Sequence, residues 1–157
     1  MAKCKVTGRN LLTIYHPLFT KGTKWCGPGN VSKGYDDLGK KAKTDMCCRD
    51  HDTCDDFMTA GETKHGLTNN AKYTRLNCKC DEEFRKCLTS VNTSTAQAVG
   101  KFYFNVVQNK CYKLDYLQIK CLSWGGLFKR SCQEYELDTT KQKTWQFFDA
   151  IEFKKPK

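Results

Sequence analysis

Cys47-Cys48-Arg49-Asp50-His51-Asp52-Thr53-Cys54 is the stretch that decides the fold, because Cys80 and Cys87 repeat its cysteine spacing. Seven residues make about two helical turns, so the two cysteines of each pair lie on one helix face, about 10 Å apart. Equal spacing allows two antiparallel helices to be joined at both ends, by Cys47–Cys87 and Cys54–Cys80 bridges. A parallel pairing also satisfies the spacing, but the polar connector between the two segments favours the antiparallel arrangement.

A histidine and an aspartate accompany these cysteines on the helix faces. At about 100° per residue, His51 falls within about 40° of Cys47, and Asp81 lies beside Cys80. In the antiparallel register both side chains face the seam between the helices, where a carboxylate fixes the tautomer of an imidazole. A core histidine that is merely satisfied by a carboxylate is the structural alternative. Asp52 points about 100° away from His51 and is left for another task.

The loop Trp25-Cys26-Gly27-Pro28-Gly29-Asn30 is a candidate calcium site. Its glycines allow conformations that turn carbonyl oxygens inward, and calcium takes six to eight oxygens from carbonyls and carboxylates. A Cys26–Cys48 bridge would pin this loop beside the helix turn that carries Asp52. An ordinary Gly-Pro-Gly turn is the alternative. Zinc is disfavoured, because neither Cys-Cys nor Cys-x-Cys has the usual zinc spacing and oxidised cysteines cannot ligate a metal.

The composition indicates a single secreted domain. Eleven of the 157 residues are cysteine, which is hard to explain in a reducing cytosol, so we expect disulfides and an extracellular location. Sequons at Asn30 and Asn92 predict glycosylation sites. No segment approaches the length of a membrane span, so we expect any membrane contact to be peripheral.

The charge favours an anionic partner. The net charge is +10, which suits phospholipid head groups or sulfated glycans. A solvated basic surface is the alternative. Nucleic acid fits a disulfide-rich secreted chain poorly, so we expect no nucleic-acid partner.

The pattern along the chain predicts a fold that is mainly α with a small β appendage. Loop residues are expected over 25–43, with Thr44-Asp45 as a helix cap, and polar, turn-like residues over 61–73. Helices are expected over residues 44–60, 74–91 and 95–107. Alternation with a period near two predicts short strands at 111–114, 133–137 and 144–147.

Five segments together resemble secreted phospholipase A2 of group III, the bee-venom-like type. They are Trp25–Asn30, Asp45–Asp52, Ala60–Asn69, Cys78–Asp81 and Gly100–Asn105, and the resemblance extends over roughly residues 23 to 153. A Cys-Cys-x-x-His-Asp segment with a calcium loop upstream is a specific combination. The resemblance implies a disulfide-stapled antiparallel helix pair, a calcium loop and C-terminal β strands, forming a domain over residues 23–157.

The resemblance also implies a role for each site residue. Calcium would be bound by the main-chain carbonyls of Trp25, Gly27 and Gly29 and by the Asp52 carboxylate. His51 would be the general base that activates a water, oriented by Asp81, with Tyr103 hydrogen-bonded behind it. Calcium and the Gly27 N–H would stabilise the oxyanion formed at the ester carbonyl. The implied disulfides are Cys26–Cys48, Cys47–Cys87, Cys54–Cys80, Cys78–Cys111 and Cys121–Cys132.

The implied activity is calcium-dependent hydrolysis of the sn-2 ester of glycerophospholipids at a membrane surface. A toxin-like receptor or channel ligand on the same scaffold is the main alternative. A catalytically dead version usually lacks the calcium carboxylate or the histidine, and both are present here. A basic glycan-binding module is a third reading, separable by heparin retention.

One segment lies outside the resemblance. Residues 1–22 form an N-terminal extension with the odd cysteine, Cys4, which points to a second chain joined through a disulfide; a capped thiol is the alternative.

Apolar residues in two places are candidate membrane contacts. They are Ile14 and Tyr15 in the extension, and Trp124 and Phe128 in the segment 122–130, where two cations follow the apolar residues. A hairpin tip packed on its own domain is the alternative for the second place.

Overall fold

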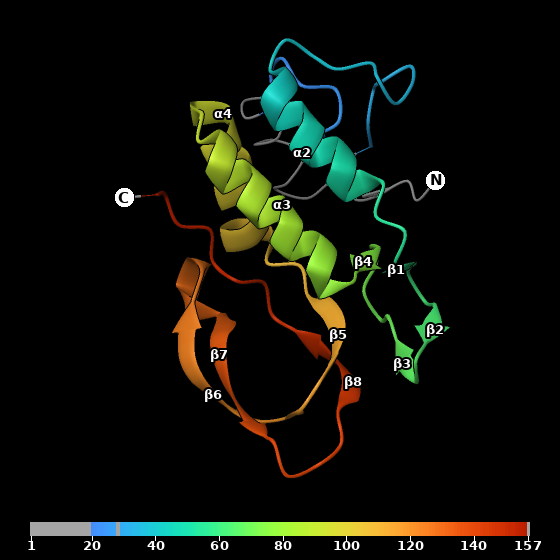
Figure 1. Cartoon of the computed structure of the whole chain (residues 1–157), viewed down its shortest axis with the longest axis vertical. Coiled ribbons are helices and arrows are strands. Elements are labelled where there is room, and N and C mark those ends of the chain that lie inside the picture. The colour runs from blue at the N-terminus through green and yellow to red at the C-terminus, as the bar shows by residue number, and fades with distance from the viewer. Residues whose placement is uncertain (1–19, 28, 157) are drawn as a thin grey trace.

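The computed structural model describes residues 20–27 and 29–156. Two helices form its centre, α2 (Ala42–Asp52) and α3 (Cys78–Val91). The Cys47–Cys87 disulfide joins the middle of α2 to the last part of α3, and Cys54–Cys80 joins the residue two past the end of α2 to the first turn of α3, so the pair is antiparallel. The antiparallel alternative is therefore the one that forms, and Figure 1 shows the two helices side by side.

α2 is shorter than the sequence pattern predicted, because the expected helix over 44–60 ends at Asp52. Asp56 accepts hydrogen bonds from Tyr112 Oη (2.6 Å), Lys64 Nζ (2.6 Å) and Asn77 Nδ2 (2.8 Å). These distant partners draw the chain away from the helix axis and into the short strand β1 (Phe57–Met58). The Thr44-Asp45 cap was also wrong, since Lys41 is the N-cap and both residues lie inside the first turn.

α3 begins later than predicted, at Cys78 rather than residue 74. The Asn77 side chain caps the helix by accepting a hydrogen bond from the Lys79 N–H at 2.9 Å. The residues just before it form β4 (Arg75–Leu76), which pairs with β1. The polar connector contains a second small hairpin, β2 (Thr63–Lys64) with β3 (Leu67–Thr68).

The third predicted helix is present as two consecutive elements. They are α4 (Ser94–Gly100) and the π-helix η1 (Lys101–Val107), which together cover the expected 95–107. Gly100 lies where a side chain would not fit, because a Cβ there would come within 2.5 Å of the Phe153 ring. The C-terminal segment therefore packs directly on the backbone of this helix.

The C-terminal part forms two separate two-stranded antiparallel sheets (Figure 1). β5 (Cys111–Asp115) pairs with β8 (Thr144–Phe148), and β6 (Leu117–Gly125) pairs with β7 (Ser131–Asp138). The short 3-10 helix η2 (Leu127–Lys129) lies between β6 and β7. The three predicted strands are present. β6 was not predicted, because register irregularities interrupt its pairing with β7 and blur the alternation of a strand.

The main core lies between the helices and the C-terminal segment. It contains Trp25, Phe84, Leu88, Val99, Phe104 and Phe153, all less than 9% exposed. The five disulfides are those that the resemblance implied, with Cys26–Cys48, Cys78–Cys111 and Cys121–Cys132 in addition to the two between the helices. Cys4 lies outside the described residues. Among the helices that the structure describes, none has the length and apolar character needed to cross a bilayer.

Candidate active site

His51 and Asp81 meet across the seam of the helix pair. His51 Nε2 lies 2.7 Å from Asp81 Oδ1, and both side chains are less than 10% exposed. The Tyr103 hydroxyl, carried by η1, donates a hydrogen bond to the same carboxylate oxygen at 3.1 Å. Because the carboxylate accepts a hydrogen bond from Nε2–H, the neutral imidazole carries its lone pair on Nδ1. Within the described residues, Nδ1 has no hydrogen-bond partner.

Two aromatic rings hold the imidazole in this orientation. Phe84 stacks on it with ring centroids 4.3 Å apart, and Tyr103 approaches edge-on at 5.0 Å. The aromatic contacts restrict rotation of the ring, while the bond to Asp81 selects its tautomer. The arrangement suits a base that accepts a proton at one defined atom.

Asp52, the next residue, has a partly buried carboxylate without a partner among the described residues. Its side chain makes no hydrogen bond or ion pair with any residue in the described ranges. Burial raises the pKa of Asp52 to about 7; nearby Asp45 acts in the same direction and His51 opposes it. Partial desolvation of a carboxylate without a partner costs free energy, which a bound cation would offset.

The loop at Trp25 offers oxygen atoms that fit such a cation. The carbonyl oxygens of Trp25, Gly27 and Gly29 accept no hydrogen bond from a described residue. Gly29 has φ +75°, a conformation that other residues rarely adopt. Carbonyl oxygens together with one carboxylate are the donor set of a hard cation such as calcium. No cluster of three or more His, Cys, Asp or Glu side chains suited to a metal occurs between residue 20 and residue 156, Pro28 apart.

Asp45 anchors this loop, a role that the sequence analysis missed. Its fully buried carboxylate accepts hydrogen bonds from the backbone N–H groups of Lys24 (2.9 Å), Trp25 (2.7 Å) and Gly39 (2.8 Å). A usable signal was present, because Asp45 precedes Cys48 by three residues and so shares its helix face. Once Cys48 is bridged to Cys26, that face points at the loop.

We expect Asp45→Asn to weaken calcium binding by at least about tenfold and to lower the melting temperature. An amide offers one acceptor oxygen to three N–H donors and adds its own donor, so buried groups lose their partners. Calcium titration followed by calorimetry measures the first effect and thermal unfolding the second. Asp36→Asn, an exposed aspartate nearby, is the matched control. A dissociation constant within twofold of wild type for Asp45→Asn would refute the anchoring role.

The remaining predicted residues lie apart from this cluster or outside the described residues. Asn30 is exposed next to the loop, and Ser32 Oγ donates a hydrogen bond to its side-chain oxygen at 2.9 Å. Asn92 is exposed at the end of α3 in a left-handed conformation. Trp124 and Phe128 lie on the β6–β7 hairpin. Ile14 and Tyr15 fall among residues 1–19, outside the described residues.

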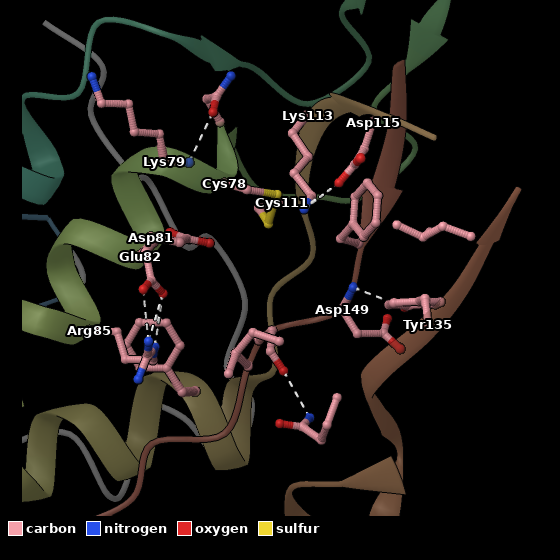
Figure 2. Close-up of a pocket in the computed structure, with 17 residues that line it drawn as sticks. Cys78, Lys79, Asp81, Glu82, Arg85, Cys111, Lys113, Asp115, Tyr135 and Asp149 are labelled. Carbon is pink, nitrogen blue, oxygen red and sulfur yellow. Dashed lines mark hydrogen bonds and ion pairs between the residues drawn. A yellow bond between two sulfur atoms is a disulfide. The ribbon is translucent and has the colours of Figure 1, made fainter. Parts of the chain in front are cut away.

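A separate cavity of about 540 Å³ lies on the other flank of α3, against the β strands (Figure 2). Asp81 is among its lining residues, but His51, Asp52 and the loop at Trp25 are not. Its charged groups are largely paired with one another: Arg85 binds Glu82 at 2.8 Å, and Lys113 binds Asp115 at 2.8 Å. Burial raises the pKa of Tyr135 to about 12, so this phenol stays protonated. The cavity therefore offers no free base or nucleophile.

Comparisons with known proteins agree on one family. The family model described as phospholipase A2 matches residues 19–115. A phospholipase A2 from Bombus pensylvanicus is 47% identical over 133 residues, 84% of this chain and 97% of that protein. One from Xylocopa aruana is 50% identical over 144 residues, 90% of this chain and 78% of that protein. One from Apis mellifera is 49% identical over 133 residues, 84% of this chain and 78% of that protein. The chain belongs to the phospholipase A2 family, in its bee-venom-like group III.

Proposed function

We propose that this chain is a secreted, calcium-dependent phospholipase A2 that releases the sn-2 fatty acid of glycerophospholipids. One observation carries the proposal. His51 presents an open Nδ1 while Asp81 holds its other nitrogen at 2.7 Å, and the neighbouring Asp52 carboxylate has no partner in the described residues. A positioned base beside a cation ligand is what hydrolysis by an activated water requires.

In the proposed reaction, His51 Nδ1 takes a proton from a water molecule as that water attacks the sn-2 carbonyl carbon. Asp81 stabilises the imidazolium that forms, and the Tyr103 hydroxyl keeps the Asp81 carboxylate in place. The Gly27 N–H donates a hydrogen bond to the developing oxyanion. The imidazolium then returns its proton to the glycerol oxygen as the ester C–O bond breaks, which yields a fatty acid and a lysophospholipid.

Calcium is the cofactor in this proposal, with Trp25, Gly27, Gly29 and Asp52 as its ligands. When bound, it supplies positive charge that polarises the ester carbonyl and stabilises the oxyanion. The free carbonyls and the unpartnered carboxylate support this assignment. Asp45 and the Cys26–Cys48 disulfide keep the loop beside α2.

The surroundings in which the enzyme works follow from charge and cysteine content. Five disulfides and the absence of a membrane-spanning helix among the described residues suit a secreted, extracellular enzyme. The net charge of +10 favours membranes that contain anionic lipid. Asn30 and Asn92 are exposed and accessible to glycosylation. We also propose that residues 1–22 are an extension to the domain at 23–157. Cys4, in this extension, would link the protein to a second chain.

The test is hydrolysis of vesicles whose phospholipids carry a labelled sn-2 chain. In millimolar calcium we expect release of the labelled fatty acid, and excess chelator should lower the rate by at least about a hundredfold, since charge stabilisation of the oxyanion is lost. Adding calcium back should restore the rate. An sn-2 ether analogue, which cannot be hydrolysed, is the substrate control. Undiminished release in chelator, or none from folded protein in calcium, would contradict the proposal.

A further inference from the structure

The end of the β6–β7 hairpin, residues 122–130, exposes large apolar side chains to solvent. We call this segment the hairpin tip. Phe128 is 75% exposed, Trp124 55%, Leu122 52% and Leu127 46%. Single exposed apolar residues are ordinary, but four within one short segment mark a contact surface. The backbone of the tip contacts its own domain at Gly126 and Leu127, while these four side chains keep about half or more of their surface exposed.

The tip is held firmly although its apolar side chains are not packed. The Cys121–Cys132 disulfide joins the two strands directly behind it. Gln108, the residue that ends η1, donates a hydrogen bond from Nε2 to the Leu127 carbonyl at 3.3 Å. A Cβ at Gly126 would lie 2.1 Å from that same nitrogen, so only glycine permits this contact. The exposed side chains are thus presented on a preformed support.

The backbone of the tip is unfavourable for the residues that occupy it. Phe128 has φ +59° and Lys129 has φ +50°, both in the left-handed region that suits glycine. Since Phe128 is largely exposed, packing within the protein does not compensate for this conformation. Strained residues of this kind cluster at functional sites and ligand contacts.

The charges around the tip match a negatively charged surface. Lys129 and Arg130 follow Phe128, and the Arg130 guanidinium lies over the Phe128 ring at 5.4 Å. Neither cation forms an ion pair with a described residue. Glu134 lies opposite Ser123 in the β6–β7 pairing, and Glu152, beside Gly125, pairs with Lys154 at 3.9 Å. Aromatic residues beside free cations are typical of protein segments at the membrane interface.

We propose that the hairpin tip inserts into the interface of anionic phospholipid bilayers and tethers the enzyme to its substrate. Trp124 and Phe128 enter the interface between head groups and acyl chains, while Lys129 and Arg130 contact anionic phosphates. The proposal rests on the proposed function, because the bilayer is where the substrate resides. It adds a contact surface separate from the His51 site, supported on the end of the helix that carries Tyr103.

The experiment measures partition of the protein into vesicles of dialkyl ether phospholipids, which cannot be hydrolysed. Vesicles of phosphatidylcholine are compared with vesicles that also contain phosphatidylglycerol. The tip variant is Trp124→Ser with Phe128→Ser, and the control is Leu117→Ser. Leu117 is 39% exposed at the opposite end of β6, on the order of 25 Å away at roughly 3.3 Å per residue. Melting temperatures establish that each variant is folded.

We expect the partition coefficient of the tip variant to be at least about tenfold lower than that of wild type. Burial of a single aromatic side chain in the interface already accounts for a change of about that size. Leu117→Ser should stay within twofold. Lys129→Gln with Arg130→Gln should remove the preference for phosphatidylglycerol, at about fivefold per cation. Lys120→Gln, whose lysine is paired with Glu136 at 3.0 Å, is the charge control.

A second readout uses Trp124 directly. Brominated lipids should quench the fluorescence of wild type, and Trp124→Phe should lose that quenching although Trp25 and Trp145 remain. Turnover of a short-chain phospholipid below its micelle concentration should be equal in wild type and the tip variant. Wild-type partition by the tip variant, or quenching that survives in Trp124→Phe, overturns the proposal. If wild type does not hydrolyse the short-chain substrate in calcium, the proposed function is contradicted. The partition experiment still tests the role of the hairpin tip in that case.

Discussion

His51→Gln is expected to lower phospholipid turnover by about 10²- to 10⁴-fold, the usual contribution of a positioned general base. Glutamine has similar length and can still donate a hydrogen bond to Asp81, so the packing against Phe84 and the fold should be retained. It offers no basic nitrogen at the position of Nδ1, so the water is no longer activated.

The rate is measured with the labelled vesicle substrate, and again with short-chain substrate so that membrane binding does not affect the result. His65→Gln is the matched control. His65 is exposed and stacks on Trp145 with ring centroids 3.8 Å apart, which leaves it outside the His51 cluster. The control should keep wild-type turnover. A His51→Gln rate within tenfold of wild type would remove His51 from the role of base.

Asp52→Asn is expected to abolish the stabilisation of the protein by calcium and to make the calcium-free protein more stable at pH 8. Burial raises the pKa of Asp52 from 3.8 to about 7 in the calcium-free fold. The fold therefore favours the protonated carboxyl, and this stability is complete below pH 3.8 and is lost as the pH rises through 7. At pH 8 the wild type carries a partly buried carboxylate without a partner among the described residues, which asparagine replaces with a neutral group.

Calcium affinity should show the opposite dependence on pH. In the proposed site the ligand is the ionised Asp52 carboxylate, so below pH 7 a proton should compete with calcium and affinity should fall by about tenfold for each pH unit. Calorimetric titration at pH 6 and pH 8, with thermal unfolding in calcium and in chelator, measures both effects. Asp50→Asn, an exposed aspartate on the same helix, should behave as wild type. Equal dissociation constants at the two pH values would contradict the assignment of Asp52.

The helix pair was predictable because it depends on local periodicity. Two cysteines two turns apart must share a helix face, and this periodicity alone predicts that His51 faces Asp81. Element boundaries were less predictable. α2 stops at Asp52 because Asp56 binds Tyr112, a residue far along the chain. β6 was missed because its irregular pairing with β7 breaks the alternation on which a strand prediction rests.

The sequence by itself determined which residues are available for chemistry: the equal cysteine spacing, the adjacent His51 and Asp52, and the glycines of the loop. The tertiary structure decided what surrounds them. It gives Asp45 to the loop as an anchor and leaves Asp52 partly buried with a raised pKa. It also exposes Phe128 at the end of a braced hairpin. Whether a side chain is buried, and which groups it contacts, depends on segments distant in sequence. Neither property could therefore be predicted from the pattern of nearby residues.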